Sequence, residues 1–133
     1  MLGKTDLSEL LAEMKPKLQN GDYVFVSLPN MLKIDFSEVI ATFKEKEGTT
    51  IILEKEKADA LKLKYDYIAS WITLKVNSSL AAVGLTAAFS NALAASQISC
   101  NVVAAYYHDH IFVAKKDGEK AMLILEELAI KNT

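Results

Sequence analysis

The chain opens with a hydrophobic pattern typical of an amphipathic helix. Five apolar residues follow the i, i+3, i+4, i+7, i+11 spacing of one helical face: Leu7, Leu10, Leu11, Met14 and Leu18. Asp6 can cap the first turn, Pro16 should kink or loosen the last turn, and Asn20-Gly21 should end the helix. The pattern therefore predicts a helix that reaches Leu18.

The rest of the first half is rich in β-formers. Runs of β-branched and aromatic residues predict strands at 23–28, 39–43 and 49–53, the last two joined by a polar hairpin connection. Residues 29–38 show no clear period and are interpreted as a loop or short turn. Helix formers at 54–63 predict a short helix.

The second half has a sharper pattern. A strand at 71–76 leads through Asn77-Ser78-Ser79, which offers N-cap chemistry, into an alanine-rich helix from Leu80 to about Ser96. A strand at 98–105, a polar turn, a strand at 111–113 and a helix opened by Asp117-Gly118-Glu119 complete it. Strand, helix, strand, strand, helix is most of a ferredoxin-like unit, so the predicted class is α+β, with helices on one face of an antiparallel sheet.

Composition places the chain among ordinary globular proteins. Its 133 residues fit one domain or two small subdomains, with 51% apolar and 24% charged residues. The nearly uncharged stretch 77–107 contains too many polar groups for a bilayer span, and the N-terminus lacks the apolar core of a signal peptide. We expect a cytoplasmic protein with no membrane partner.

Charge argues against nucleic acid as a partner. The formal net charge is −2, and each of the 15 basic residues is lysine. Arginine is the usual bidentate group for phosphates and guanine edges, although a lysine-biased genome would give the same composition. RNA binding through Tyr23 and Phe25 on a sheet remains an alternative that this composition disfavours.

The few residues with reactive side chains give little support for catalysis. Cys100 is the one cysteine and lies among apolar residues, so it is interpreted as a buried hydrophobe. His108 and His110, at i and i+2, should point to the same side of a strand, but a metal site needs three or four ligands. Asp109 could pair with either histidine, yet no activated nucleophile accompanies them. We expect no enzyme activity, no metal and no cofactor.

Three segments of the second half carry a family resemblance. Residues 71–87, 98–103 and 108–113 resemble an ACT domain, with the closest similarity to small tandem ACT-like proteins without an assigned function. The resemblance implies two ACT-like subdomains: residues 1–65, a helix plus a degenerate unit, and residues 66–133. The first half lacks the long first helix, and the second half stops without a fourth strand. We hypothesise that the strand 23–28 fills that missing edge.

The resemblance also implies a ligand site. ACT domains bind amino acids or similar metabolites between two units, at the loop after the first strand and the start of the first helix. Helix N-termini offer unpaired N–H groups that suit a carboxylate. The candidate ligand-binding residues are Asn77, Ser78, Ser79, Leu80, Val83, Gly84, Leu85, Asn101, Val102, His108, Asp109 and His110.

Structural roles compete with ligand contact at several of these positions. Asn77 and the serines after it can simply cap the helix, and Gly84 can simply allow close packing. Asn101 can bind a ligand or hydrogen-bond to backbone or water. The expected function is a non-enzymatic regulatory or sensor protein for an amino-acid-like ligand, homodimeric and acting through an unknown effector protein. The alternative is an ACT-shaped protein-interaction module without a metabolite.

Overall fold

The computed structural model describes residues 6–29, 34–76 and 82–133, and these form two compact units. The small unit is Asn20–Ala69. The large unit combines the residues up to Gln19 with Ser70–Thr133. Strand β5, Ile68–Lys75, begins in the small unit and continues in the large one.

The small unit is an antiparallel sheet with a short helix. It contains β2 (Tyr23–Leu28), the 3-10 helix η1 (Phe36–Glu38), β3 (Val39–Lys44), β4 (Thr49–Glu54), α2 (Lys55–Ala60) and the start of β5. The strand order is β3-β4-β2-β5. Its core consists of Val24, Val26, Ile51, Leu53 and Ala58. The three strands, the hairpin and the helix predicted for this region are confirmed, the helix in a shorter form.

The β3–β4 hairpin depends on a glycine. Gly48 has a φ of +155°, and a Cβ there would lie 2.9 Å from the carbonyl oxygen of Leu28. The Glu45 amide closes the turn by donating to the Gly48 carbonyl at 3.1 Å. A side chain at this position would force β2 and β4 apart.

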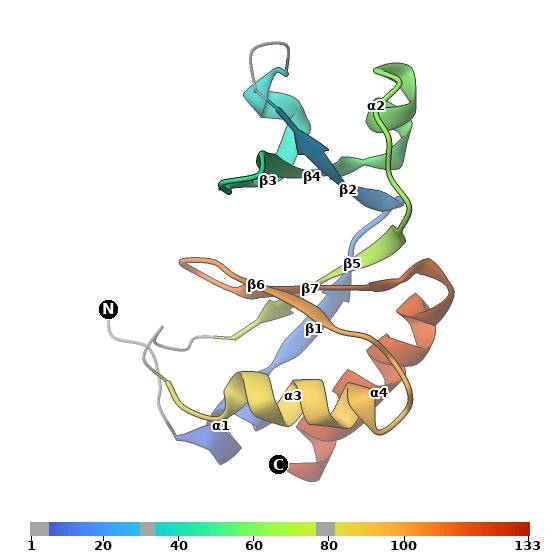
Figure 1. Ribbon diagram of the computed structural model, residues 1–133. Helices are drawn as coiled ribbons and strands as arrows, with labels where there is room; N and C mark the ends of the chain where they lie inside the picture. Colours follow the sequence, from blue (N-terminus) through green and yellow to red (C-terminus); the bar gives the residue numbers. More distant parts are fainter. Residues whose placement is uncertain (1–5, 30–33, 77–81) are drawn as a thin grey trace. The chain divides into compact units, whose positions relative to one another are not determined.

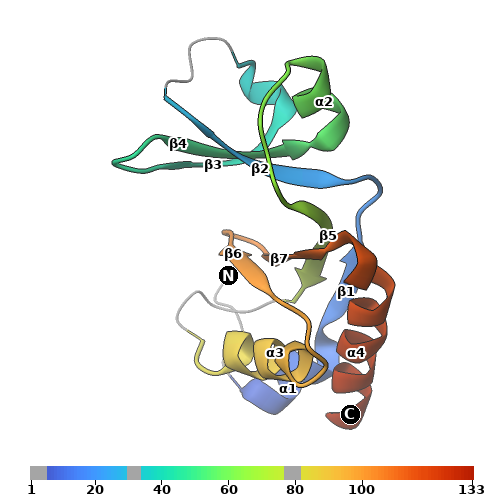
Figure 2. The same cartoon turned by 45° about the vertical axis from the view of Figure 1, so that its right-hand side comes forward.

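The large unit is a sheet with helices on one face (Figures 1 and 2). Its elements are α1 (Leu7–Glu13), β1 (Lys15–Leu18), most of β5, α3 (Leu85–Ala94), β6 (Asn101–Ala104), β7 (Asp109–Ala114), the 3-10 helix η2 (Lys115–Asp117) and α4 (Gly118–Lys131). The strand order is β1-β5-β7-β6. The predicted order of strand, helix, strand, strand, helix is confirmed.

Side chains alternate across this sheet. On β5, Ile72 and Leu74 enter the core beneath the helices, whereas Trp71, Thr73 and Lys75 project from the opposite face. The core is completed from the helices and from β7, mainly by Leu10, Leu11, Met14, Phe89, Leu93, Ile111, Val113, Ala121 and Leu125. The face opposite the helices carries most of the polar groups discussed below.

The first helix ends earlier than predicted. It stops at Glu13, and residues 15–18 form β1, although Leu18 fits the helical stripe. Pro16 lacks an N–H and disfavours helical geometry in the residue before it, whereas an edge strand accepts a proline. Because β1 pairs only with β5 among the described strands, Pro16 can occupy that edge.

The hypothesis that the strand 23–28 supplies the missing fourth strand is wrong, because β1 supplies it. The edge of the large sheet is filled by Lys15–Leu18, which pairs with β5 in antiparallel register. Strand β2 pairs with β5 only at Ile68 and Ala69, inside the small unit. The predicted boundary at residue 65 differs accordingly, because α1 and β1 share the core of the second half.

The alanine-rich helix of the second half starts later than predicted. Helix α3 begins at Leu85, after Gly84, whose φ of +96° is left-handed and interrupts the helix. A Cβ at Gly84 would lie 3.2 Å from Cδ2 of Leu7. The predicted cap residues Asn77, Ser78 and Ser79, with Leu80, lie outside the described residues.

Among the described residues, none of the helices combines the length and apolar character needed to cross a membrane.

Candidate functional site

The large unit contains a cavity where β5 ends. Its volume is about 630 Å³. The lining residues come from the end of α1, the start of β1, the end of β5 and the β6–β7 turn: Ala12, Glu13, Lys15, Lys75, Val76, Tyr107 and His108. Cavities of this volume are typical of small-molecule sites.

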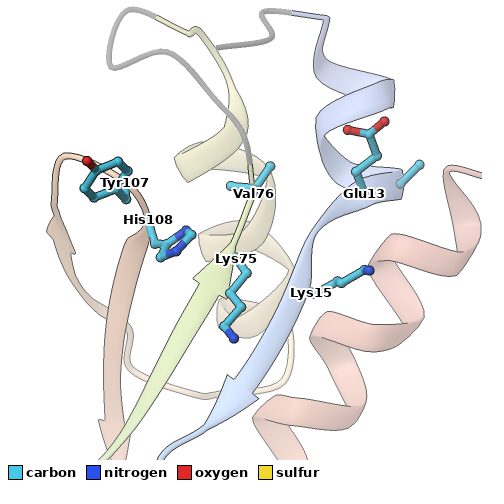
Figure 3. Close-up of a pocket in the computed structure, with 7 residues that line it drawn as sticks. Glu13, Lys15, Lys75, Val76, Tyr107 and His108 are labelled. Carbon is cyan, nitrogen blue, oxygen red and sulfur yellow. The ribbon is translucent and has the colours of Figure 1, made fainter. Parts of the chain in front are cut away.

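The strand order places these residues together (Figure 3). Glu13 and Lys15 lie on one side, Tyr107 and His108 on the other, and β5 runs between them. Lys15 stands opposite Lys75 in the β1–β5 register. Val76 is buried and supplies apolar surface, whereas Tyr107 is exposed at the β6–β7 turn, where its ring packs edge-on against Tyr106.

His108 contributes an unsatisfied polar atom. Its Nδ1 is buried and has no hydrogen-bond partner, and its ring points toward β5 (Figure 3). A buried polar atom without a partner is costly and uncommon in native proteins. A ligand in the cavity could satisfy it.

His110 lies on the same face, but its Nδ1 already has partners within the protein. Trp71 donates from Nε1 to His110 Nδ1 at 3.0 Å, and Thr73 Oγ1 lies 3.2 Å from the same nitrogen. Gln19 donates from Nε2 to Thr73 Oγ1 at 2.8 Å, which leaves the threonine hydrogen for His110. The His110 ring is therefore held by protein groups, in the tautomer that carries hydrogen on Nε2.

The electrostatics of β7 follow from partial burial. Burial lowers the pKa of His110, and the nearby His108 lowers it further. The carboxylate of Asp109 raises this pKa and so partly offsets the two effects. Burial raises the pKa of Asp109, partly offset by His110 and His108. Burial also raises the pKa of the Cys100 thiol, which packs against the core as the sequence predicts.

The other predicted site residues are dispersed. Leu85 is buried in the core, Val102 packs against it, and Val83 is exposed. The Asn101 side chain donates to the carbonyl of Phe112 at 3.3 Å, so it follows the backbone alternative. Of the twelve candidates, only His108 lines the cavity among those described.

Sequence reasoning missed most of the cavity. Lys15 and Lys75 become neighbours only through the β1–β5 pairing, whereas the sequence pattern predicts a helix over residues 15–18. The available signal was Pro16, which argues against a helix through that point. Lys75 and Val76 could have been included as the last residues of the strand before the expected loop.

A second, smaller cavity lies in the small unit. Its volume is about 230 Å³, and it is lined by Gly21, Asp22, Glu54, Lys55, Glu56 and Asp59. Lys55 pairs with Asp59 at 2.7 Å, and Tyr65 donates to Asp59 at 2.6 Å. The charges of Lys55 and Asp59 therefore neutralise each other within the protein. This cavity is a weaker candidate for a ligand site than the one in the large unit.

Two alternative site types find no support in the described residues. No cluster of three or more His, Cys, Asp or Glu side chains is arranged to hold a metal in residues 6–29, 34–76 and 82–133. Tyr23 is buried, and its hydroxyl donates to the Asn20 carbonyl, so it is not available to stack on RNA bases.

Comparison with known proteins gives two family matches. ACT domain profiles match residues 2–70 and residues 67–127. The matches overlap at the start of β5, the strand that contributes to both units. No curated protein matches the chain.

Solved structures give the same fold. A Vibrio cholerae protein of unknown function, described as a possible transport protein, is 49% identical, with a TM-score of 0.84, and the match covers 92% of this chain and 95% of that one. An Agrobacterium tumefaciens protein is 19% identical, with a TM-score of 0.66 over 87% and 89% of the two chains.

The regulatory subunit of aspartate kinase from Thermus thermophilus is 8% identical, with a TM-score of 0.55 over 86% of this chain and 95% of that one. At this identity the likeness concerns the fold alone. Together with the strand order of each unit, the two domain matches show that this chain belongs to the ACT domain family.

Proposed function

We propose that this chain is a regulatory or sensor protein that binds an amino-acid-like molecule in the cavity of the large unit, without catalysis. The observation that carries the proposal is the cavity itself. It lies where β5 ends, which is the part of an ACT domain expected to hold a ligand. Its lining combines cationic, anionic and apolar side chains, which suits a molecule with a carboxylate, an ammonium group and a carbon skeleton.

Binding without chemistry agrees with the lining residues. Among the described residues that line the cavity, His108 is the natural proton-transfer group, and it has no serine or thiol beside it. The one cysteine, Cys100, packs against the core. A carboxylate ligand would instead give the buried His108 Nδ1 a partner.

Thermal unfolding in the presence of each amino acid tests the proposal. A ligand that binds only the folded state at one hundred times its Kd stabilises the protein by about 2.7 kcal/mol. We expect one chemical class of amino acid to raise Tm. The same class should have less effect on His108→Leu, which removes the unsatisfied nitrogen but keeps an apolar side chain. An unchanged Tm with every amino acid would contradict the proposal.

We also propose that the protein is a homodimer. No Asp, Glu or Lys lies between Lys75 and Asp109, so the exposed face of α3 and the edge strand β6 are uncharged. Natural proteins usually protect edge strands with charged residues. An uncharged edge next to small exposed residues such as Ala87 and Ala94 is well suited to pairing with a second copy.

The interaction-module alternative is favoured by one observation. Tyr106 and Tyr107 are both strongly exposed, and their rings pack edge-on at 5.0 Å at the β6–β7 turn. Exposed aromatic residues are enriched at protein interfaces. In a ligand-binding protein the same pair would contact the effector that receives the signal. We place both activities in the cytoplasm, which is compatible with a single cysteine outside any disulfide.

A further inference from the structure

Two lysines of the cavity stand directly opposite each other. Lys15 and Lys75 are register partners on antiparallel strands, so both side chains project from the face opposite the helices. Like charges at such positions destabilise a sheet. In Figure 3 the two ammonium groups extend in different directions, that of Lys75 along β5 and that of Lys15 sideways from β1.

The protein itself does little to neutralise this pair. Within the described part of the chain, neither Lys15 nor Lys75 forms an ion pair, and Glu13 is the one carboxylate that lines the cavity. Lys17, opposite Thr73 in the same register, adds another positive charge to this face of β1. The electrostatic potential at the cavity therefore favours an anionic ligand.

The three charged groups of the lining select among amino acids. Two ammonium groups and one carboxylate complement a molecule with two carboxylates and one ammonium group. A neutral amino acid would pair with Glu13 and one lysine and would leave the other lysine uncompensated. We infer, given the amino-acid binding proposed above, that the ligand is an acidic amino acid, whose side-chain carboxylate lies between Lys15 and Lys75.

His108 adds a polar contact to this arrangement. Its buried, unpartnered Nδ1 can carry the hydrogen of a neutral imidazole and donate it to a carboxylate oxygen. Val76 provides the apolar surface for the ligand's methylene groups. A carboxylate held by a lysine and an imidazole is recognised by charge-assisted hydrogen bonds, the strong class of such bonds.

Calorimetric titration distinguishes the ligand classes. Aspartate and glutamate are titrated beside their amides, asparagine and glutamine, and beside succinate, which has two carboxylates and no ammonium group. We expect one of the two acidic amino acids to bind about tenfold or more tightly than its amide and than succinate. Lys15→Gln and Lys75→Gln should each weaken the acidic ligand about tenfold and change the amide little.

Lys116→Gln is the matched control. Lys116 is an exposed lysine of the same unit, beyond the opposite end of β7 from His108, so this variant should bind like the unmodified protein. Without ligand, Lys15→Gln and Lys75→Gln should keep or slightly raise Tm, because each removes a repulsive pair. A clear fall in Tm would mean that the lysines serve the fold, and would overturn the inference.

The outcomes separate this inference from the proposed function. Neutral amino acids that bind as tightly as acidic ones would overturn the charge selection and leave amino-acid binding intact. Succinate that binds as tightly as aspartate would overturn the role of the ammonium group and of Glu13. No binding of any amino acid would overturn both proposals.

Discussion

At the scale of single residues, the chemistry of the large unit depends on how two histidines are partnered. His110 accepts hydrogen bonds at Nδ1 from β5, whereas His108 keeps an unpartnered Nδ1 beside the cavity. The two residues lie two positions apart, yet only His110 has a hydrogen-bond partner at Nδ1. Sequence alone could predict the shared face but could not assign these different roles.

The partners of His110 predict a pH dependence of stability. Its pKa is lowered from 6.5 in the folded protein, so the folded state binds the proton less readily than the unfolded chain. The resulting stability is present above pH 6.5 and is lost as the pH falls through the lowered pKa. Protonation at Nδ1 would turn the acceptor of the Trp71 hydrogen bond into a donor. Urea unfolding followed by Trp71 fluorescence should show this loss between neutral and mildly acidic pH.

Two substitutions separate the His110 effect from neighbouring titrations. His110→Asn keeps an acceptor near the Nδ1 position and does not titrate, so it should flatten the pH dependence in this window. His110→Leu leaves Trp71 and Thr73 without their acceptor and should cost about 1–3 kcal/mol at pH 7. Asp109 is the neighbour of His110 along β7, and its raised pKa acts in the opposite direction at lower pH. Equal pH slopes in the unmodified protein and His110→Asn would contradict this role.

At the scale of elements, α3 depends on the backbone of Gly84. Its φ of +96° is unfavourable for any residue with a Cβ, and the added carbon would press on Leu7 of α1. We expect Gly84→Ala to destabilise the protein by about 1 kcal/mol or more, measured by chemical unfolding. Ala87→Gly, within the exposed part of α3, is the comparison for helix propensity alone. If Gly84→Ala left the free energy of unfolding unchanged, the left-handed backbone at this position would not be required.

Strand β1 and helix α1 should be required for the large unit to fold. They contribute Leu10, Leu11 and Met14 to its core and close the edge of its sheet. A fragment of residues 66–133 should therefore remain largely unfolded by circular dichroism and amide NMR dispersion. A chain that joins residues 1–19 to residues 70–133 through a flexible linker should regain structure. A well-folded 66–133 fragment would instead favour the division at residue 65.

Sequence patterns succeeded where local signals and packing agree. Strand β2 was predicted with its observed bounds, because its β-branched and aromatic residues lie between turn signals. The pattern failed at β1, where Leu18 fits both a helical stripe and a strand that packs on the core. It also failed at the start of α3, where Asn77-Ser78-Ser79 offered cap chemistry but Gly84 set the first turn.

The cavity could not be predicted for a related reason. Its residues come from segments that are distant in sequence and meet only through the β1–β5–β7 strand order. The family resemblance directs attention to the loop that follows β5, and Lys75 and Val76 at the end of β5 line the cavity. The resemblance gives no reason to include Glu13 or Lys15. These residues lie at the end of α1 and the start of β1, before β2 in the sequence.

At the scale of the whole molecule, β5 links two ACT units in one short chain. It gives Ile68 and Ala69 to the small unit and the remaining residues to the large one. The large unit also takes its edge strand from the N-terminal segment, so it is built from two separate parts of the sequence, whereas the small unit is one continuous segment. The apparent loss of a fourth strand is therefore a consequence of chain order.

The uncharged surface of α3 and β6 predicts self-association. Light scattering after size exclusion should give about twice the chain mass of 14.6 kDa. Ala87→Glu and Ala104→Lys place charges on exposed positions of α3 and β6, and should shift the protein to monomers without loss of helical signal. Lys62→Glu, on an exposed residue of the small unit, serves as the control. A monomer at micromolar concentration would contradict the dimer.

Titration of isotope-labelled protein with aspartate and glutamate, followed by amide chemical shifts, tests the ligand site most directly. We predict concentration-dependent shifts centred on Glu13, Lys15, Lys75, Val76 and His108, with little change around the small-unit cavity at Asp22 and Lys55. Shifts centred on Asp22 and Lys55, or no shifts at millimolar ligand, would contradict an amino-acid site in the large unit.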